Sequence, residues 1–458
     1  MSRPTVAVSA PGKVLLAGGY LVLDRGHTGL VFGLDARIHV HVKTLPTSPG
    51  LALSEIIVRS PQFRDAEWRY GYRETEHHGG LQINQLKGHS TSTQSRNKFV
   101  ETALAYALSY VSAHSDTKIG STSITIVADT DYYSHPGSTP GTVPTRFIDF
   151  HVPLTEAHKT GLGSSAALVT AFVAAVLTHY LDEKMLQLHS DSGRRRLHNL
   201  AQAAHCAAQG KVGSGFDVAA AVYGSCVYRR FSPSILEELG EPGSPQFSQR
   251  LTRVVDESDA SNTWDMQIDK AAARLPRGLR LVMCDVDCGS ESVGMAKKVL
   301  AWRKENPDEA ALLWATLQKG NDELAEELLR LAQGITTDSR DYKNLSDTIL
   351  TIRSLIREMS AKAEVPIEPK VQTDLLDACC RISGVVGGVV PGAGGFDAIV
   401  LLVENDALPS LQQFLDTYKT TAESDSGPVI GKVRLLGVKQ DFEGLRSEDI
   451  KTYADWIR

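Results

Sequence analysis

Hydrophobic and polar positions along the first part of the chain predict several strands. Residues 5–9, 36–43 and 121–128 alternate between apolar and polar side chains, which is typical of half-buried strands. The first of these strands is expected to run into a turn at Pro11 and Gly12. The sequence thus begins as a β-rich region.

Helical patterns dominate the rest of the chain. Residues 97–113 and 165–181 predict helices, and the second is apolar nearly all round and therefore predicted to be buried. Residues 60–98 are polar, aromatic and irregular. The second half predicts amphipathic helices mixed with apolar strands, with helices at 293–304, 308–333, 343–363, 370–383 and 407–419, and strands near 279–285, 396–403 and 431–438. Strands mixed with helices, without regular alternation, predict an α+β fold.

A chain of 458 residues is long enough for more than one domain. Residues 231–270 are enriched in Ser, Pro, Gly and Glu, which predicts a connector or a peripheral insertion. We therefore expect a first domain at 1–230, a connector at 231–275 and a second domain at 276–458.

Composition and charge exclude several classes of protein. The 48 basic and 54 acidic residues give a net charge of -6, and a dedicated nucleic-acid or membrane-surface binder would need a basic excess. The apolar stretch 384–403 contains several glycines, Pro391 and Asp397, so it predicts a buried strand–loop–strand and not a membrane span. The cysteines show neither CxxC pairs nor zinc-site spacing. These features predict a cytoplasmic protein with reduced thiols.

Candidate chemistry lies in three glycine-rich segments, at residues 9–23, 159–171 and 391–402. In the second, KTGLGSSA directly precedes the apolar helix, so the free N–H groups and the positive end of the helix dipole face the loop. Glycines allow close approach of an anion, and serine hydroxyls can donate to phosphate or bind Mg²⁺. Taken alone, the loop fits a phosphate site or an ordinary helix N-cap equally well.

Two better-known phosphate motifs do not explain this loop. GLGSSA matches the G-x-G-x-x-A dinucleotide pattern, but the residues before it are polar and predict no buried strand. The acid about 20 residues later, Asp182, lies at the end of a helix instead of a second strand. No G-x-x-x-x-G-K-[ST] sequence occurs in the chain, which excludes a Walker P-loop.

The three segments, in this order, resemble motifs 1, 2 and 3 of the GHMP kinase superfamily. SAPGKVLLAGGYLVLD, NKFVETAL, KTGLGSSAALV, GKVGSGFDVAAAVYGS and PGAGGFDAIVLL further resemble the eukaryotic, fungal-type phosphomevalonate kinase family. The resemblance implies a two-domain fold, with an N-terminal ribosomal-protein-S5-domain-2-like layer, a C-terminal ferredoxin-like layer and the active site in the cleft between them. It also implies an ATP- and Mg²⁺-dependent transfer of phosphate to 5-phosphomevalonate, in the route to isoprenoids and sterols.

The resemblance also assigns candidate roles to residues of this chain. Asp217 and Lys13 match the catalytic aspartate and its lysine, and Lys159 is a third catalytic candidate. Ser165 is the candidate metal ligand. The expected ATP-phosphate loop comprises Gly161, Leu162, Gly163, Ser164, Ser165 and Ala166. The expected acceptor-binding residues are Lys13, Tyr20, Lys211, Ser214, Ser290 and Ser292, and the expected supporting residues of motif 3 are Gly392, Ala393, Gly394 and Gly395.

Some points stay open at this level. Mevalonate kinases place a magnesium-binding glutamate where this chain has AAHCAAQGK, without a carboxylate. The adenine site is expected near residues 60–110, where Trp68, Tyr70 and Asn97 are candidates. Tyr20 and His205 are weaker candidates for the acceptor site. The partners are expected to be small molecules only, with a monomer or homodimer. Alternatives are another GHMP kinase, chiefly mevalonate kinase, a diphosphomevalonate decarboxylase, and a non-catalytic nucleotide or metabolite sensor.

Overall fold

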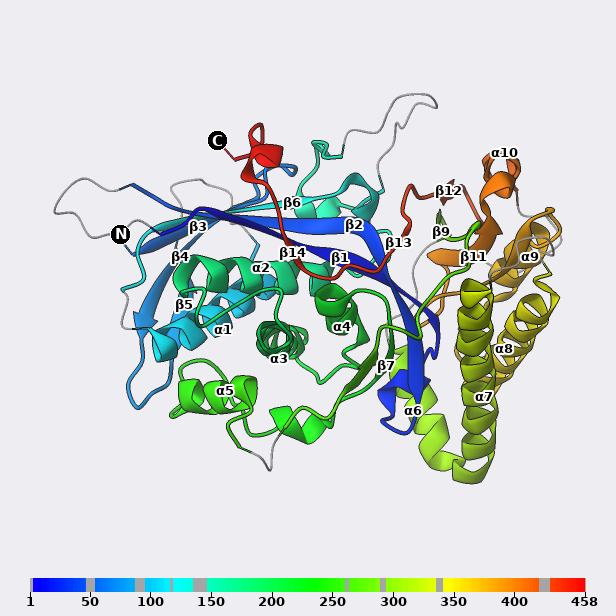
Figure 1. Cartoon of the computed structure of the whole chain (residues 1–458), viewed down its shortest axis with the longest axis horizontal. Helices are drawn as coiled ribbons and strands as arrows, with labels where there is room; N and C mark the ends of the chain where they lie inside the picture. The colour runs from blue at the N-terminus through cyan, green and yellow to red at the C-terminus, as the bar shows by residue number, and fades with distance from the viewer. Residues whose placement is uncertain are drawn as a thin grey trace.

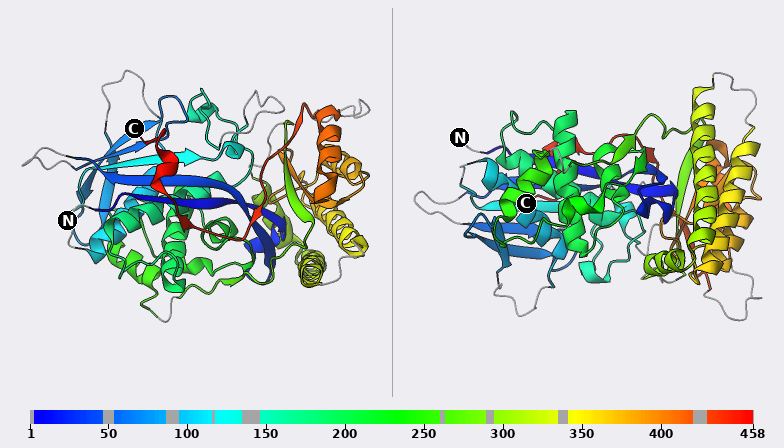
Figure 2. Two further views of the ribbon diagram at one scale, coloured as in Figure 1. Left: turned by 45° about the horizontal axis from the view of Figure 1, so that its top comes forward. Right: turned by 90° about the horizontal axis from the view of Figure 1, so that it is seen from below.

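A computed structural model describes residues 3–46, 54–86, 95–115, 118–134, 146–259, 263–288, 294–334, 341–419 and 429–457. These residues form a ten-stranded sheet and a four-stranded sheet, each packed against helices. The smaller sheet and its helices lie at one end of the larger layer (Figures 1 and 2). The α+β class predicted from the sequence is confirmed.

The larger sheet is built on two long antiparallel strands, β1 (Val6–Ala17) and β2 (Thr28–Thr44). Its strand order is β14-β1-β2-β6-β3-β4-β5, with β7 and β13 also paired to β2 and β8 paired to β7. The remaining bounds are β3 (Glu55–Arg59), β4 (Glu67–Glu74), β5 (Leu81–Gln85), β6 (Thr122–Ala128), β7 (Cys226–Arg229), β8 (Gln267–Asp269), β13 (Gln440–Asp441) and β14 (Arg446–Ser447).

Strand β1 continues past the residues that predict a turn. The pairing with β2 shifts register between Pro11 and Lys13, and the strand then runs on to Ala17. Proline has no N–H to donate to the β-ladder, so the hydrogen-bonding pattern is interrupted at Pro11. The shift in register forms a β-bulge, and the strand continues beyond it. Beyond the bulge, the Lys13 N–H donates to Leu162 O at 2.9 Å, which ties the strand to the second glycine-rich segment.

Four helices pack under the larger sheet, namely α1 (Lys98–His114), α2 (Ser164–Tyr180), α3 (Asp191–Gln209) and α4 (Phe216–Tyr223). Helix α2 contacts β1 and β2 on one side and α1, α3 and α4 on the others, as seen in Figure 1. Nearly all of its side chains are therefore buried, from Ala166 to Tyr180. The buried helix predicted for this apolar segment is confirmed.

Two segments without a clear sequence pattern also join this layer. Within residues 60–98, β4 places Trp68 and Tyr70 inward and Arg69 outward, an alternation that its charged and aromatic side chains obscure. Within residues 231–270, α5 (Phe247–Asp256) packs on α1 and α3 through the fully buried Phe247 and Leu251. The second segment thus belongs to the core of the larger layer, and the domain boundaries at 230 and 276 stay predictions.

The smaller layer has strand order β10-β11-β9-β12. Its strands are β9 (Leu279–Val286), β10 (Val385–Val389), β11 (Ala398–Glu404) and β12 (Val433–Leu435), and its helices are α6 (Met295–Glu305), α7 (Pro307–Gln333), α8 (Lys343–Lys362), α9 (Lys370–Cys379) and α10 (Leu408–Thr417). β10 and β11 pair antiparallel, so the apolar stretch 384–403 is the predicted strand–loop–strand. Among the described residues, no helix is long and apolar enough to cross a bilayer.

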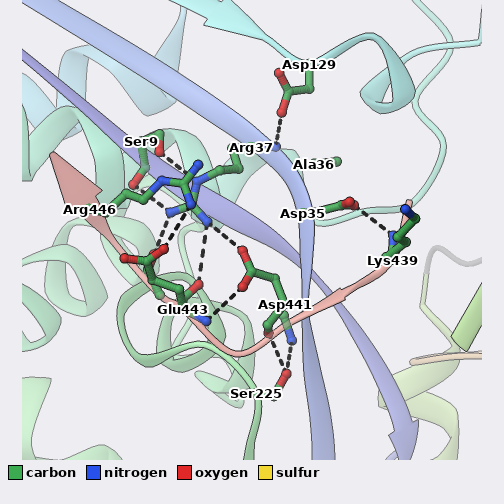
Figure 3. Close-up of polar contacts among 12 residues, drawn as sticks. Ser9, Asp35, Ala36, Arg37, Asp129, Ser225, Lys439, Asp441, Glu443 and Arg446 are labelled. Atoms are coloured by element: carbon green, nitrogen blue, oxygen red, sulfur yellow. Dashed lines mark hydrogen bonds and ion pairs between the residues drawn. The ribbon is translucent and has the colours of Figure 1, made fainter. Parts of the chain in front are cut away.

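After β12 the chain returns to the larger sheet, a path that the sequence did not predict. β13 pairs with β2, and β14 pairs with β1 as an edge strand. The fully buried Arg37 on β2 holds this returning segment, as Figure 3 shows. Its guanidinium donates to Ser9 Oγ at 2.6 Å, to Asp441 Oδ2 at 3.1 Å and to the carbonyl oxygen of Gly444.

Candidate functional site

The second glycine-rich segment forms a tight loop that opens helix α2. Gly161 and Gly163 have φ angles of 77° and 80°, in the left-handed region that favours glycine. Gly163 caps α2, and Ser164 and Ser165 form its first turn. The unpaired N–H groups of this turn and the positive end of the dipole therefore point to the loop, as the sequence predicted.

Lys13 lies directly against this loop. Its Nζ donates to Gly161 O at 3.2 Å, and its aliphatic stem fills the space where a Gly163 side chain would be. A Cβ on Gly163 would come within 2.8 Å of Lys13 Cε, so glycine is required there. Burial lowers the pKa of Lys13, and the nearby charge of Asp217 partly opposes this shift.

A second helix begins on the other side of Lys13. Gly215, with φ 86°, caps α4, and Asp217 lies in its first turn, where its Oδ1 accepts from the Val218 N–H at 2.9 Å. The ring of the intervening Phe216 is 5.7 Å from Lys13 Nζ. Two helix N-termini and the ammonium group of the partly buried Lys13 thus meet at one place, which is an environment suited to anions.

The backbone before Asp217 is held by a buried tyrosine. The hydroxyl of Tyr228 donates to Ser214 O at 2.9 Å, and a Cβ on Gly215 would come within 2.7 Å of that hydroxyl. The Ser214 carbonyl therefore helps to fix the backbone just before α4.

His205, on the last turns of α3, lies between these two loops. Its Nε2 is 3.2 Å from Ser165 Oγ, and its Nδ1 is 3.9 Å from Asp217 Oδ2. The side chain is 2% exposed. From the sequence, His205 is only a weaker candidate for the acceptor site.

The third glycine-rich segment contacts the first one. The Tyr20 hydroxyl donates to Ala393 O at 2.5 Å, and a Cβ on Gly19 would come within 2.6 Å of Gly392 O. A Cβ on Gly394 would come within 2.3 Å of Ile367 O. The sequence suggested that Gly392, Gly394 and Gly395 pack on the phosphate loop; the close approaches found here are to residues 19–20 and 367 instead.

The other predicted acceptor residues are more scattered. Lys159 is exposed at the start of the phosphate loop, and Tyr133 forms a backbone bridge with it. Tyr20 is buried, which raises the pKa of its hydroxyl. Lys211 is exposed at the end of α3. Ser290 and Ser292 lie outside the described residues.

A cavity of about 620 Å³ opens beside α1 and the end of α3. Its charged lining is formed by Arg96, Lys98, Glu101, Lys211 and Glu241, and its apolar lining includes Ala203, Ala207 and Leu239. This cavity could not be predicted from the sequence, because its walls come from four separate segments of the chain.

The aromatic residues suggested for an adenine site are not available to a ligand. Trp68 and Tyr70 are 4% and 0% exposed, inside the core of the larger layer. Asn97 is the N-cap of α1, with its Oδ1 accepting from the Val100 N–H at 3.2 Å. Trp68 and Tyr70 are two residues apart on β4, so both side chains point to the same, buried face of the sheet.

Comparison with known proteins is consistent with this geometry. The family model for the N-terminal domain of GHMP kinases matches residues 142–225, which include both helix N-termini. A solved phosphomevalonate kinase from Streptococcus pneumoniae, in complex with phosphomevalonate and AMPPNP, superposes with a TM-score of 0.58 at 15% identity, over 89% of this chain and 95% of that chain. The fold and the paired glycine loops match those of the GHMP kinases, and the GHMP kinase fold predicted from the sequence is confirmed.

Curated relatives narrow the family further. The chain is 50% identical to phosphomevalonate kinase of Aspergillus fumigatus, over 98% of each chain. It is 49% identical to phosphomevalonate kinase of Gibberella zeae, over 100% of each chain. The chain therefore belongs to the phosphomevalonate kinase family, as its motifs predicted.

Proposed function

We propose that this protein transfers the γ-phosphoryl group of ATP to the phosphate of 5-phosphomevalonate, giving diphosphomevalonate and ADP. The observation that carries the proposal is the meeting of Lys13 with the N-terminal turns of both α2 and α4. Full-length similarity to the phosphomevalonate kinases supports the choice of acceptor.

The phosphate loop is proposed to hold the ATP phosphates. Gly161 and Gly163 let the backbone approach closely, and the first-turn N–H groups of α2 supply donors without any side-chain reorganisation. Since phosphoryl transfer passes through a loose transition state, holding and neutralising the phosphates contributes most of the rate enhancement.

Lys13 is proposed to neutralise the charge that gathers between donor and acceptor. Its Nζ lies against the loop at Gly161 O and on the same side as Phe216, next to Asp217. Burial lowers its pKa in the free protein, and phosphate dianions placed beside it would favour the charged ammonium form. The bound substrates would thus supply the counter-charge that the free site lacks.

Asp217 is proposed to position Lys13 and a magnesium ion more than to remove a proton. A phosphomonoester has a second pKa of about 6 and is mostly dianionic at neutral pH, so it needs little deprotonation. The carboxylate is fixed at the N-terminus of α4, where the helix dipole stabilises a negative charge.

The side chains of Ser165 and Asp217 fit a magnesium ion. Both present hard oxygen donors, and they lie on the two sides of His205. No cluster of three His, Cys, Asp or Glu side chains suited to a metal occurs in the part of the chain that the structure describes. That donor set suits Mg²⁺, which often binds through one or two protein groups together with substrate phosphates. When bound, the ion would neutralise phosphate charge.

The remaining substrate contacts follow from position. Lys159, exposed at the entrance to the phosphate loop, is proposed to bind the acceptor phosphate, together with the side chain of Ser214. Ser290 and Ser292, which lie outside the described residues, stay acceptor-site candidates on the resemblance alone. Tyr20 is proposed to act through Ala393, since its hydroxyl is already bonded there. The cavity lined by Lys98 and Lys211 is proposed to take the nucleotide, because its volume of about 620 Å³ lies in the range of ligand pockets.

An acceptor panel tests the proposed reaction. The protein is given ATP and Mg²⁺ with mevalonate, phosphomevalonate, diphosphomevalonate, homoserine or galactose, and ADP release is followed in a coupled assay. Turnover with phosphomevalonate alone is the expected result. Turnover with mevalonate would identify a mevalonate kinase, and binding of nucleotide without any turnover would identify a sensor. A cytoplasmic location and a monomeric or homodimeric state remain predictions.

A further inference from the structure

The side chain of His205 is in polar contact with both Ser165 and Asp217. Its Nε2 lies 3.2 Å from Ser165 Oγ, at the start of α2, and its Nδ1 lies 3.9 Å from Asp217 Oδ2, at the start of α4. The ring is 2% exposed and packs near Phe99, with ring centroids 5.8 Å apart. A buried polar ring in this position is well placed to determine how both oxygen groups are oriented.

The partners of His205 determine which ring nitrogen carries the proton. The side-chain amide nitrogen of Gln209 lies 3.4 Å from His205 Nε2. A carboxylate can only accept, so in a neutral ring the contact with Asp217 favours the proton on Nδ1 and leaves His205 Nε2 as the nitrogen that accepts. The ring proton is then on Nδ1, which faces the carboxylate of Asp217.

This arrangement also determines the direction of the Ser165 hydroxyl. Because His205 Nε2 accepts, the proton of Ser165 points toward the imidazole. The lone pairs of Ser165 Oγ are then left for a ligand, and a lone pair suits a cation, whereas a phosphate oxygen would need the proton. The tautomer of His205 therefore determines whether Ser165 Oγ can bind a cation or can donate to a phosphate oxygen.

We propose that His205 is a positioning residue that commits Ser165 to bind a magnesium ion and orients Asp217 through its Nδ1–H. The inference rests on the proposed phosphoryl transfer but not on the identity of the acceptor. It accounts for the location of a polar, buried histidine between Ser165 Oγ and Asp217 Oδ2, the carboxylate oxygen that does not accept from the Val218 N–H.

The first test reads the tautomer directly in the protein without substrates. Two-bond ¹H–¹⁵N correlation spectra distinguish a protonated Nδ1 from a protonated Nε2, and the His205 signals are assigned by their loss in His205→Gln. We expect the proton on Nδ1. A proton on Nε2 would overturn the proposal, because Ser165 would then accept from the ring and present its own proton to the loop.

The second test measures binding of the non-hydrolysable analogue AMPPNP with and without Mg²⁺, by calorimetry. His205→Leu is expected to reduce the strengthening of binding by Mg²⁺ by about 10–100-fold, the usual effect of losing a group that orients a metal ligand. AMPPNP binding without Mg²⁺ should change little. An unchanged Mg²⁺ effect in His205→Leu would contradict the proposal.

Two further variants separate positioning from folding. His205→Gln retains an oxygen that can accept from Ser165 and should recover part of the Mg²⁺ effect, even if His205→Leu folds poorly; no recovery in a folded His205→Gln would contradict the proposal.

His198, fully buried on the same helix and packed near Trp264 with ring centroids 5.5 Å apart, provides the control. His198→Gln should lower thermal stability without changing the Mg²⁺ effect. If it changed that effect equally, the role of His205 would be structural only. None of these readouts requires phosphomevalonate, so they stand even if the acceptor is a different molecule.

Discussion

The role expected of Asp217 depends on whether the acceptor group must lose a proton before it attacks ATP. If the acceptor were a hydroxyl, a carboxylate at this position would be required as a general base. For a phosphate acceptor that is already ionised, the same carboxylate has only to hold Lys13 and a metal ion in place. The two roles differ in how much activity the neutral amide retains.

Asp217→Asn is therefore expected to lower kcat by less than about 10²-fold. The amide keeps the shape of the side chain and can still accept from the Val218 N–H, so the start of α4 is preserved. Steady-state kinetics with phosphomevalonate and ATP measures the effect. A loss within or beyond the 10²–10⁴-fold range typical of general-base removal would contradict the positioning role.

Lys13→Met is expected to lower kcat by about 10²–10³-fold, the usual effect of removing one preorganised group from the transition state. Methionine keeps most of the apolar stem against Gly163. The same substitution should raise thermal stability at neutral pH, because burial of the charged form opposes folding and lowers the pKa of Lys13.

The stability difference has a definite pH dependence. Between the lowered pKa of folded Lys13 and its ordinary value near 10.5, the unfolded chain binds more protons, so wild-type stability gains from rising pH in that window. The advantage of Lys13→Met should thus shrink as the pH rises through it. Lys43→Met, at a lysine whose Nζ donates to Ile457 O at 3.0 Å, is the control and should show no such gain. A Lys13→Met protein that is less stable at all pH values would contradict the assignment.

At the scale of elements, the junction between β1 and α2 determines the shape of the site. The bulge at Pro11–Lys13 directs one N–H to Leu162 O, and Gly163 leaves room for the Lys13 stem. The sequence predicted the glycine loop and the helix after it, because each follows from local rules. It predicted a turn instead of the bulge, since whether a strand continues past Pro-Gly depends on β2, its pairing partner.

Gly163→Ala tests this junction. The substitution places a residue with φ near 80° in the left-handed region, at about 1–2 kcal/mol, and pushes a Cβ to within 2.8 Å of Lys13 Cε. We expect weaker ATP binding and a lower kcat in addition to the loss of stability. Gly278→Ala is the matched control, with φ 87° and no atom within 4 Å of its Cβ. It should lose similar stability and keep full activity; equal kinetics in the two variants would argue against the role of Gly163.

The inward face of β4 and the cavity near Lys211 could not be predicted from local hydrophobic patterns in the sequence. β4 carries charged and aromatic residues in alternation, so its inward face is recognisable only once β3 and β5 lie beside it. The cavity near Lys211 combines residues from β5, α1, the end of α3 and the segment 236–242, which no single segment of sequence specifies. Elements with strong periodicity, such as α2 and α7, were predicted because their burial follows from their own composition.

At the scale of the whole molecule, the chain end ties the two layers together. The segment after β12 leaves the smaller sheet, and β13 and β14 then pair with the larger one. Leu445 donates its N–H to Val222 O at 3.2 Å, so the returning segment also contacts the end of α4, whose first turn carries Asp217. Such a long-range path has no signal in local sequence, because its partners are distant in the chain.

Arg37→Met is expected to destabilise the protein by about 3–5 kcal/mol, the usual effect of removing one partner from a buried ion pair. Arg37 has a side chain 1% exposed, and its loss removes the guanidinium donor of Asp441 Oδ2 and of the Gly444 carbonyl. Urea unfolding measures the change. Arg59→Met, which removes an exposed ion pair with Glu67, is the control and should cost no more than about 1 kcal/mol. A loss at Arg37 as small as that of the control would show that the chain end is held by other contacts.

Net charge also needs to be considered at this scale. The protein carries a net charge of -6, yet its proposed substrates are strongly anionic. Lys13, Lys159 and the N–H groups at the start of α2 and α4 must therefore create a local positive region against the sign of the whole molecule. Composition alone could not predict this, because the relevant charges are few and are gathered by the fold.

The identity of the acceptor group is tested most directly by ³¹P NMR of the reaction mixture. The protein is incubated with ATP, Mg²⁺ and phosphomevalonate, and the product phosphorus signals are recorded. Transfer to phosphate predicts that the monoester signal is replaced by two mutually coupled diphosphate signals while ATP becomes ADP. Two uncoupled monoester signals would show transfer to a hydroxyl group and would contradict a site built around Lys13 for a phosphate acceptor.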